Sequence, residues 1–213
     1  MRKRWLVFGV PVLALMAAAV PSVFADSPAP GRAGRAEVRF MEGMSDHHQM
    51  ALDMAHDCLN KAKTESVHTL CQHIVTAQSA EIKTLHDWLL VWYKVDYQPV
   101  SIMIMGHSST AATPDSGMHM GGTMEADSAM GMAHDPSGMM GMMAGLNRLE
   151  GRDYEIAFLE SMIDHHDDAV HMSERILKVA EHKELREMAQ KIIADQTAEI
   201  KAMEDLVRHY DKQ

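Results

Sequence analysis

The sequence has little positive charge and, after its first 25 residues, no long hydrophobic run. Its 213 residues contain 20 Lys and Arg against 30 Asp and Glu, a formal net charge of −10. Such an acidic chain is poorly suited to bind nucleic acid or an anionic membrane surface, and it favours cationic ligands. Because no later apolar run approaches the roughly 20 residues of a membrane span, we expect no membrane partner for the mature protein.

The sequence also lacks the motifs of two common enzyme classes. A diiron four-helix enzyme needs Glu-x-x-His on two helices together with two further glutamates. Only Glu65-x-x-His68 fits this pattern, and the second copy of a repeat described below has Lys183 and Arg186 in its place. No Ser or Cys lies in an arrangement that indicates an activated nucleophile. We therefore do not expect an enzyme, although a cuprous oxidase activity stays open.

Residues 1–25 have the features of a secretory signal peptide. Three basic residues at positions 2–4 precede an apolar run from Trp5 to Val20, and Ala25 ends a stretch typical of a cleavage site. We therefore expect a periplasmic or secreted protein. In that oxidising compartment the default state of Cys58 and Cys71 is a disulfide, with a thiolate metal site as the alternative. The two cysteines flank residues 61–66, an expected turn between antiparallel helices, nearly symmetrically.

One segment of the chain occurs twice. Residues 40–54 read FMEGMSDHHQMALDM, and residues 158–172 read FLESMIDHHDDAVHM. With a constant offset of 118 positions, Phe40–Leu89 aligns with Phe158–Val207 without a gap and with 18 identities in 50 positions. A gap-free alignment of this length indicates one supersecondary unit used twice.

Each copy has the pattern of a helical hairpin. Residues spaced four and three apart form a seam along one helix face, and a second apolar stripe follows after the expected turn. Four such helices bury their stripes best as an antiparallel four-helix bundle, so the expected fold class is all-α. The first seam consists of Phe40, Met44, His47, Ala51, Met54 and Cys58. The expected boundaries are 26–35 for a disordered N-terminus, 36–97 for the first hairpin, 98–146 for a flexible insert and 147–213 for the second hairpin, with both hairpins in one domain.

Each copy places a methionine three residues before an adjacent histidine pair. Residues three and four apart on a helix are neighbours, so each Met can reach both rings of its pair. Thioether and imidazole donors together suit copper. Packing is the alternative, but buried imidazoles need hydrogen-bond partners, and two adjacent pairs are a costly way to fill a core. The predicted ligands in the two copies are Met44, His47, His48, Met50, Met54, Met162, His165, His166 and Met172.

Acidic residues near these motifs are candidate partners of the histidine rings. Asp46 and Asp164 immediately precede the His pairs, and we expect them to accept a ring N–H. Glu81 and Glu199 occupy matching positions of the two second helices. For each of them, a metal ligand, a capping partner and a surface charge are the alternatives that stay open. Histidines without a counterpart in the other copy, such as His73, are interpreted as mostly surface residues. The two sites need not be equivalent, because the second copy has an aspartate where the first has Met50.

The insert between the repeats is rich in Gly, Ser and Met and contains eleven of the 21 methionines. Soft thioethers select Cu(I), imidazole extends the range to Cu(II), and silver would bind on the same grounds. The alternative to metal binding is that methionine is simply common in a low-complexity segment. Methionine exposed to solvent is prone to oxidation, however, so its abundance here favours a functional explanation. The predicted ligands in this insert are Met103, Met105, His107, Met118, His119, Met120, Met130, Met132 and His134.

The pattern Phe-x-x-x-Met-x-x-His-His-x-x-Ala-x-x-Met, followed by a helix with Gln and Glu, resembles the domain-of-unknown-function family 305. The resemblance covers residues 37–93 and 153–211. It implies a ferritin-like four-helix fold and, for exported members, copper binding. The family signature falls on Met44, His47, His48, Met54, Met162, His165, His166 and Met172.

Together these observations predict an exported copper-binding protein that buffers, sequesters or delivers copper, chiefly Cu(I), and contributes to copper resistance. Cu(II) is a second candidate ion and silver a mimic. The partners expected are the metal ion and another periplasmic copper-handling protein. Two alternatives stay open, namely a ferritin-like metal-dependent oxidoreductase and a metal-free helical module that binds a partner protein.

Overall fold

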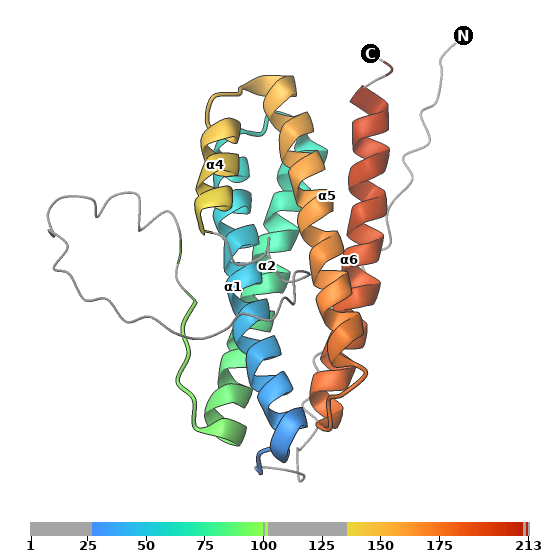
Figure 1. Ribbon diagram of the computed structural model, residues 1–213. Helices are drawn as coiled ribbons and strands as arrows, with labels where there is room; N and C mark the ends of the chain where they lie inside the picture. Colours follow the sequence, from blue (N-terminus) through green and yellow to red (C-terminus); the bar gives the residue numbers. More distant parts are fainter. Residues whose placement is uncertain (1–26, 100, 102–135, 211, 213) are drawn as a thin grey trace, which may run out of the picture.

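The computed structural model describes residues 27–99, 101, 136–210 and 212 (Figure 1). Two predictions lie outside this part of the chain. One is the signal peptide at residues 1–25, and the other is the set of nine insert ligands from Met103 to His134. Within the described part, no helix is long and apolar enough to cross a membrane.

Every regular element of the described residues is helical, which confirms the predicted all-α class. The elements are α1 (Gly31–Lys61), α2 (Glu65–Trp88), α4 (Pro136–Leu146), α5 (Gly151–Ile176) and α6 (Lys183–Tyr210), together with the π-helical turn η1 (Leu89–Tyr93) that continues α2.

The long helices form a four-helix bundle of two hairpins (Figure 1). Helices α1 and α2 form one antiparallel pair, and α5 and α6 form the other. Helices α1 and α5 pack against each other in opposite directions and join the hairpins. Because α2 and α5 run the same way, α2 ends and α5 begins at opposite ends of the bundle, as in ferritin-like bundles. The segment after α2 and η1 contacts α1, where the Tyr97 hydroxyl donates to Asp46 over 2.6 Å.

The predicted seam faces the core. All six of its residues in α1 are buried, and five of the six matching residues in α5 are buried, with Met172 partly so. The apolar core divides into two clusters along the bundle. One cluster includes Met54, Phe158, Met162 and Met203, and the other includes Phe40, Met44, Leu85, Ala169 and Ile192.

A buried glutamate of α5 caps the N-terminus of α2. The Glu155 carboxylate accepts hydrogen bonds from the backbone N–H groups of Lys63 and Thr64, at 2.6 and 2.8 Å. The hydroxyls of Thr64 and Tyr210 also donate to it. Burial raises the pKa of Glu155, but these hydrogen bonds outweigh burial, so its pKa is lowered. The anion therefore satisfies N–H groups that a helix start leaves without partners.

A second buried glutamate makes the equivalent contact at the opposite end of the bundle. Glu37 of α1, 118 positions before Glu155, accepts the backbone N–H groups of Glu181 and His182 just before α6, at 2.7 and 3.0 Å. Tyr93 and the His182 ring also bond to its carboxylate. Burial raises the pKa of Glu37, and the hydrogen bonds lower it further than burial raises it. Each hairpin therefore caps the second helix of the other hairpin.

Two predicted boundaries are wrong. The N-terminal segment 26–35 was expected to be disordered, yet α1 begins at Gly31. Its small residues allow close packing, because Gly34 lies against the backbone of Ala29 and the ring of Tyr93. The end of the insert is also helical, since residues 136–146 form α4. There Met143 and Leu146 are buried in the core cluster that contains Phe158, so part of the Met-rich composition serves packing.

The hairpin turns follow the prediction in the first copy. Helix α1 ends at Lys61 and α2 begins at Glu65, and a disulfide joins Cys58 to Cys71 across this turn with a Cα–Cα distance of 6.3 Å. The bridge ties the two helices of the first hairpin together. The second hairpin has the buried apolar residues Ile176 and Ala189 at the matching positions.

Candidate metal centre

The four histidines of the two motifs meet at the contact between α1 and α5. The rings of His47 and His165 lie against each other, with centroids 3.7 Å apart and an interplanar angle of 34°. In each pair the second ring, His48 or His166, lies 6.2 Å from its neighbour. All four side chains are buried, with exposed fractions of 7% or less. Because the seams of two equivalent antiparallel helices meet, the two His pairs form one cluster.

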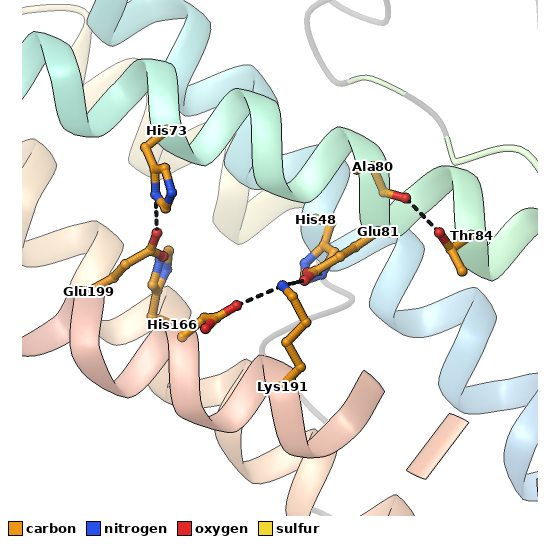
Figure 2. Close-up of polar contacts among 9 residues, drawn as sticks. His48, His73, Ala80, Glu81, Thr84, His166, Lys191 and Glu199 are labelled. Carbon is orange, nitrogen blue, oxygen red and sulfur yellow. Dashed lines mark hydrogen bonds and ion pairs between the residues drawn. The ribbon is translucent and has the colours of Figure 1, made fainter. Parts of the chain in front are cut away.

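A glutamate, buried at position 81 and partly buried at position 199, holds one histidine of each pair (Figure 2). Nε2 of His48 lies 2.9 Å from Glu81 of α2, and Nε2 of His166 lies 2.8 Å from Glu199 of α6. Burial raises the pKa of both carboxyls, but the hydrogen bonds and charges around them lower it more. With an ionised carboxylate as acceptor, Nε2 carries the proton and Nδ1 of a neutral ring keeps its lone pair. Nδ1 of His48 and Nδ1 of His166 are buried without a hydrogen-bond partner.

The prediction that Asp46 and Asp164 accept the ring N–H is wrong. Asp46 accepts the hydroxyl of Tyr97, and Asp164 is exposed. Consecutive residues on a helix point about 100° apart, so the residue before a buried histidine faces away from it. The acceptors are Glu81 and Glu199, which the sequence left undecided. Their identity at matching repeat positions was the signal that pointed to them.

Each glutamate also bonds to a residue of the other hairpin, and sequence reasoning missed both contacts. The second oxygen of Glu81 lies 2.9 Å from Nζ of Lys191 in α6. The second oxygen of Glu199 lies 2.8 Å from Nδ1 of His73 in α2. Positions 73 and 191 are 118 apart, so they are the same position of the repeat. The two halves therefore share one arrangement of histidine and glutamate. They differ in the residue of the other hairpin that contacts the glutamate, which is Lys191 in one half and His73 in the other.

The predicted methionine ligands lie on both sides of the histidine cluster. Met44 and Met172 belong to the core cluster on one side, and Met54 and Met162 belong to the cluster on the other. Each side thus has one methionine from each hairpin, because α1 and α5 run in opposite directions. Met44, Met54 and Met162 are at most 1% exposed. Soft sulfur donors therefore border the imidazoles at both ends of the cluster.

Several polar atoms in this region have no hydrogen-bond partner. Neither ring nitrogen of His165 has one, nor do the side-chain amides of Gln78 and Gln196, which are also repeat equivalents. Burial lowers the pKa of His165 well below its usual range, the charges of His166 and His48 lower it further, and a contact with the His47 backbone, too poor in geometry to count as a hydrogen bond, offsets only part of this. The His165 ring is therefore neutral. Leaving a buried polar atom without a partner costs about 1–3 kcal/mol, so such a group points to a partner such as an ion or a water molecule.

The predicted metal donors in this region are imidazole nitrogens and thioether sulfurs. Within the described ranges, no three His, Cys, Asp or Glu residues are grouped so that they could hold a metal ion. A metal bound here would therefore rely on methionine sulfur alongside imidazole nitrogen, which is the donor set of copper. The remaining predicted ligand, Met50, is buried but belongs to neither core cluster, and its counterpart Asp168 is exposed.

The chain is similar to one family and to several solved structures. The family described as "Domain of unknown function (DUF305)" matches residues 37–207. No curated protein matches the chain. CopM in the Cu(II)-bound form is 30% identical with a TM-score of 0.59, covering 82% of this chain and 97% of that chain. CopM in the Cu(I)-bound form is 25% identical with a TM-score of 0.59, covering 82% and 96%. A DUF305 fragment from Deinococcus radiodurans is 25% identical with a TM-score of 0.60, covering 85% and 99%.

Proposed function

The chain belongs to the DUF305 family, and we propose that within it this protein is an exported copper-binding protein. Its buried centre of histidine and methionine side chains would bind copper, chiefly as Cu(I). Binding would buffer or sequester the ion, or hold it for delivery to another periplasmic protein, and so contribute to copper resistance. The localisation rests on the signal peptide expected at residues 1–25.

One observation carries the proposal more than any other. Glu81 and Glu199 hold His48 and His166 at Nε2, and the opposite nitrogen of each ring has no partner. A carboxylate that accepts one ring N–H fixes the ring orientation and makes the other nitrogen a better metal ligand. If these histidines served packing alone, each buried nitrogen without a partner would destabilise the fold, and no binding energy would offset that cost. The same arrangement occurs twice in one centre.

The methionines support Cu(I) over harder ions. Met44 lies four residues before His48, and Met162 lies four residues before His166, so each sulfur is a helix neighbour of a held ring. Thioethers prefer Cu(I) and bind zinc and magnesium poorly. The similarity to CopM, which has been solved with Cu(II), Cu(I) and silver bound, supports copper as the ion.

The insert would add weaker and more exchangeable sites. Its predicted ligands are nine residues between Met103 and His134. Ligands in a segment that orders on binding lose affinity to the entropy of ordering, whereas the core ligands are already held by the bundle. We therefore expect a tight class of sites in the bundle and a weaker class in the insert.

An anaerobic Cu(I) titration against a chromophoric chelator tests the proposal with matched variants. The double variant Met44→Leu/Met162→Leu removes both core sulfurs at nearly constant volume, and such swaps usually cost less than about 1.5 kcal/mol. The control is Met41→Leu, because Met41 is equally buried and the second repeat already has Leu159 at this position. We expect the double variant to weaken the tight class at least tenfold and the control to bind like the wild type.

Three results would contradict the proposal. If the double variant bound Cu(I) as tightly as the Met41→Leu control, the core methionines would serve packing. If replacing the nine insert ligands with serine abolished all tight binding, the bundle would not contain the site. Steady oxygen consumption with Cu(I) would indicate an oxidase in place of a binding protein.

A further inference from the structure

The two halves of the centre differ in one charge. We call Met44, His48 and Glu81 the Glu81 half, and Met162, His166 and Glu199 the Glu199 half. Figure 2 shows Lys191 beside Glu81 and His73 beside Glu199. The rest of each half matches the other at the 118-residue offset. The repeat therefore provides an internal comparison in which the residue paired with the glutamate differs, although the nearby residues Asp195 and Asp168 also differ from their counterparts Ala77 and Met50.

Lys191 gives the Glu81 half a permanent positive charge. Its ammonium lies 2.9 Å from Glu81 and 2.6 Å from Asp195, and its side chain is 45% exposed. Burial lowers the pKa of Lys191, but the two carboxylates raise it more, so the side chain stays protonated. Asp195 pairs with the same ammonium and is half exposed, so it offsets part of this charge. The Glu81 carboxylate is therefore shared between His48 and a cation.

In the described part of the chain, no lysine or arginine pairs with Glu199. The partner of Glu199 is His73, whose side chain is 67% exposed. This contact is made by an imidazole ring nitrogen, whereas Lys191 brings a lysine ammonium to Glu81. The Glu199 carboxylate therefore has no ammonium beside it to offset its negative charge. A carboxylate whose negative charge is less offset by a neighbouring cation makes its histidine partner a stronger metal ligand and favours the binding of a cation nearby.

We propose that the centre binds two soft monovalent cations in a set order, the first in the Glu199 half and the second in the Glu81 half, because Lys191 weakens the latter. This inference rests on the proposed function. The charge of Lys191 acts through one carboxylate from a partly exposed position, so solvent screens much of it. We expect it to separate the two affinities by about three- to tenfold.

Exchanging the residues at the two matched positions tests the order. The variants are Lys191→His, His73→Lys and the double exchange. Lys183→His is the control, because Lys183 is an exposed α6 lysine that pairs with Glu187 away from both glutamates. Each protein is titrated anaerobically with Cu(I), and in parallel with Ag(I), at pH 8. Ring ¹⁵N resonances of His48 and His166 in NMR spectra report which half fills first.

The expected results differ for each variant. In the wild type and the control, the His166 signals should change before those of His48. The Lys191→His variant should bring the two affinities together, the His73→Lys variant should weaken the first site about three- to tenfold, and the double exchange should reverse the order.

If copper binds in the core but the order and spacing are the same in all variants, the charge inference is overturned and the proposed function stands. If the four core histidines do not respond to copper in any protein, both are overturned.

Discussion

Replacing His165 by leucine should make the metal-free protein more stable. His165 is buried, its ring is neutral, and neither of its nitrogens makes a hydrogen bond of good geometry, since its contact with the His47 backbone offsets only part of the lowering of its pKa. Each unpartnered buried atom costs about 1–3 kcal/mol, so the two together destabilise the fold by roughly 4 kcal/mol. Against this, the variant loses the contact with the His47 ring, about 1 kcal/mol, and fits less well, about another 1 kcal/mol. The net expectation is about 2 kcal/mol of added stability.

Urea denaturation of chelator-treated protein measures this effect. The midpoint should rise while the slope with denaturant stays the same, because the area exposed on unfolding hardly changes. Phe158→Leu, on the same face of α5 and fully buried, is the control, and it should lose about 1 kcal/mol or more as a cavity forms. If His165→Leu instead lost more than about 1 kcal/mol at constant slope, the imidazole would be satisfied by packing, and the argument for a ligand site would fail.

The same variant predicts a change in pH dependence. The pKa of His165 in the folded protein is well below its usual value, so below about pH 6.5 the unfolded chain binds a proton that the folded chain does not. Stability therefore falls as the pH falls. Between pH 7.5 and 5.5 this group alone removes about 1.4 kcal/mol. We expect the pH dependence of stability in His165→Leu to lack the contribution of this group. A pH dependence of stability that is the same as in the wild type would refute the assignment of a neutral buried ring.

Further substitutions at the disulfide, at a helix cap and at two glycines test the scaffold of the bundle. Replacing Cys58 and Cys71 by alanine opens a bridge that spans 13 positions, and chain entropy predicts a loss of about 3 kcal/mol in chemical denaturation. Glu155→Gln should cost about 1.5–3 kcal/mol at pH 7, because it replaces a charged cap of α2. Since the pKa of Glu155 is lowered on folding, that difference should shrink as the pH falls through this lowered value, which a pH series of unfolding curves can follow. Gly34→Ala should lower the melting temperature, because its Cβ would press on a backbone carbonyl oxygen, whereas Gly145→Ala in α4 meets no atom within 4 Å and should be neutral or stabilising.

Four glutamates that lie between helices show why part of the structure could not be predicted from the sequence. Glu37 and Glu155 read as ordinary acidic residues near the start of two helices, yet each caps a helix of the other hairpin. Glu81 and Glu199 were left undecided for the same reason. A carboxylate becomes a cap or a histidine partner through its place between helices, and the spacing along one helix does not reveal that place. The error at residues 31–35 has a related cause, since Gly34 orders its segment through contacts with distant residues such as Tyr93.

The sequence by itself determined the properties that depend on neighbours along one helix. The repeat at an offset of 118 and the seam through His47 and His165 were enough to predict the hairpins, the helical class and which face is buried. Only the tertiary structure decided that the two His pairs stack into one cluster, and that Lys191 and His73 stand at its matched outer positions. The physical reason is that side-chain periodicity is set within a helix, whereas the register and crossing of α1 and α5 are set by packing of the whole bundle.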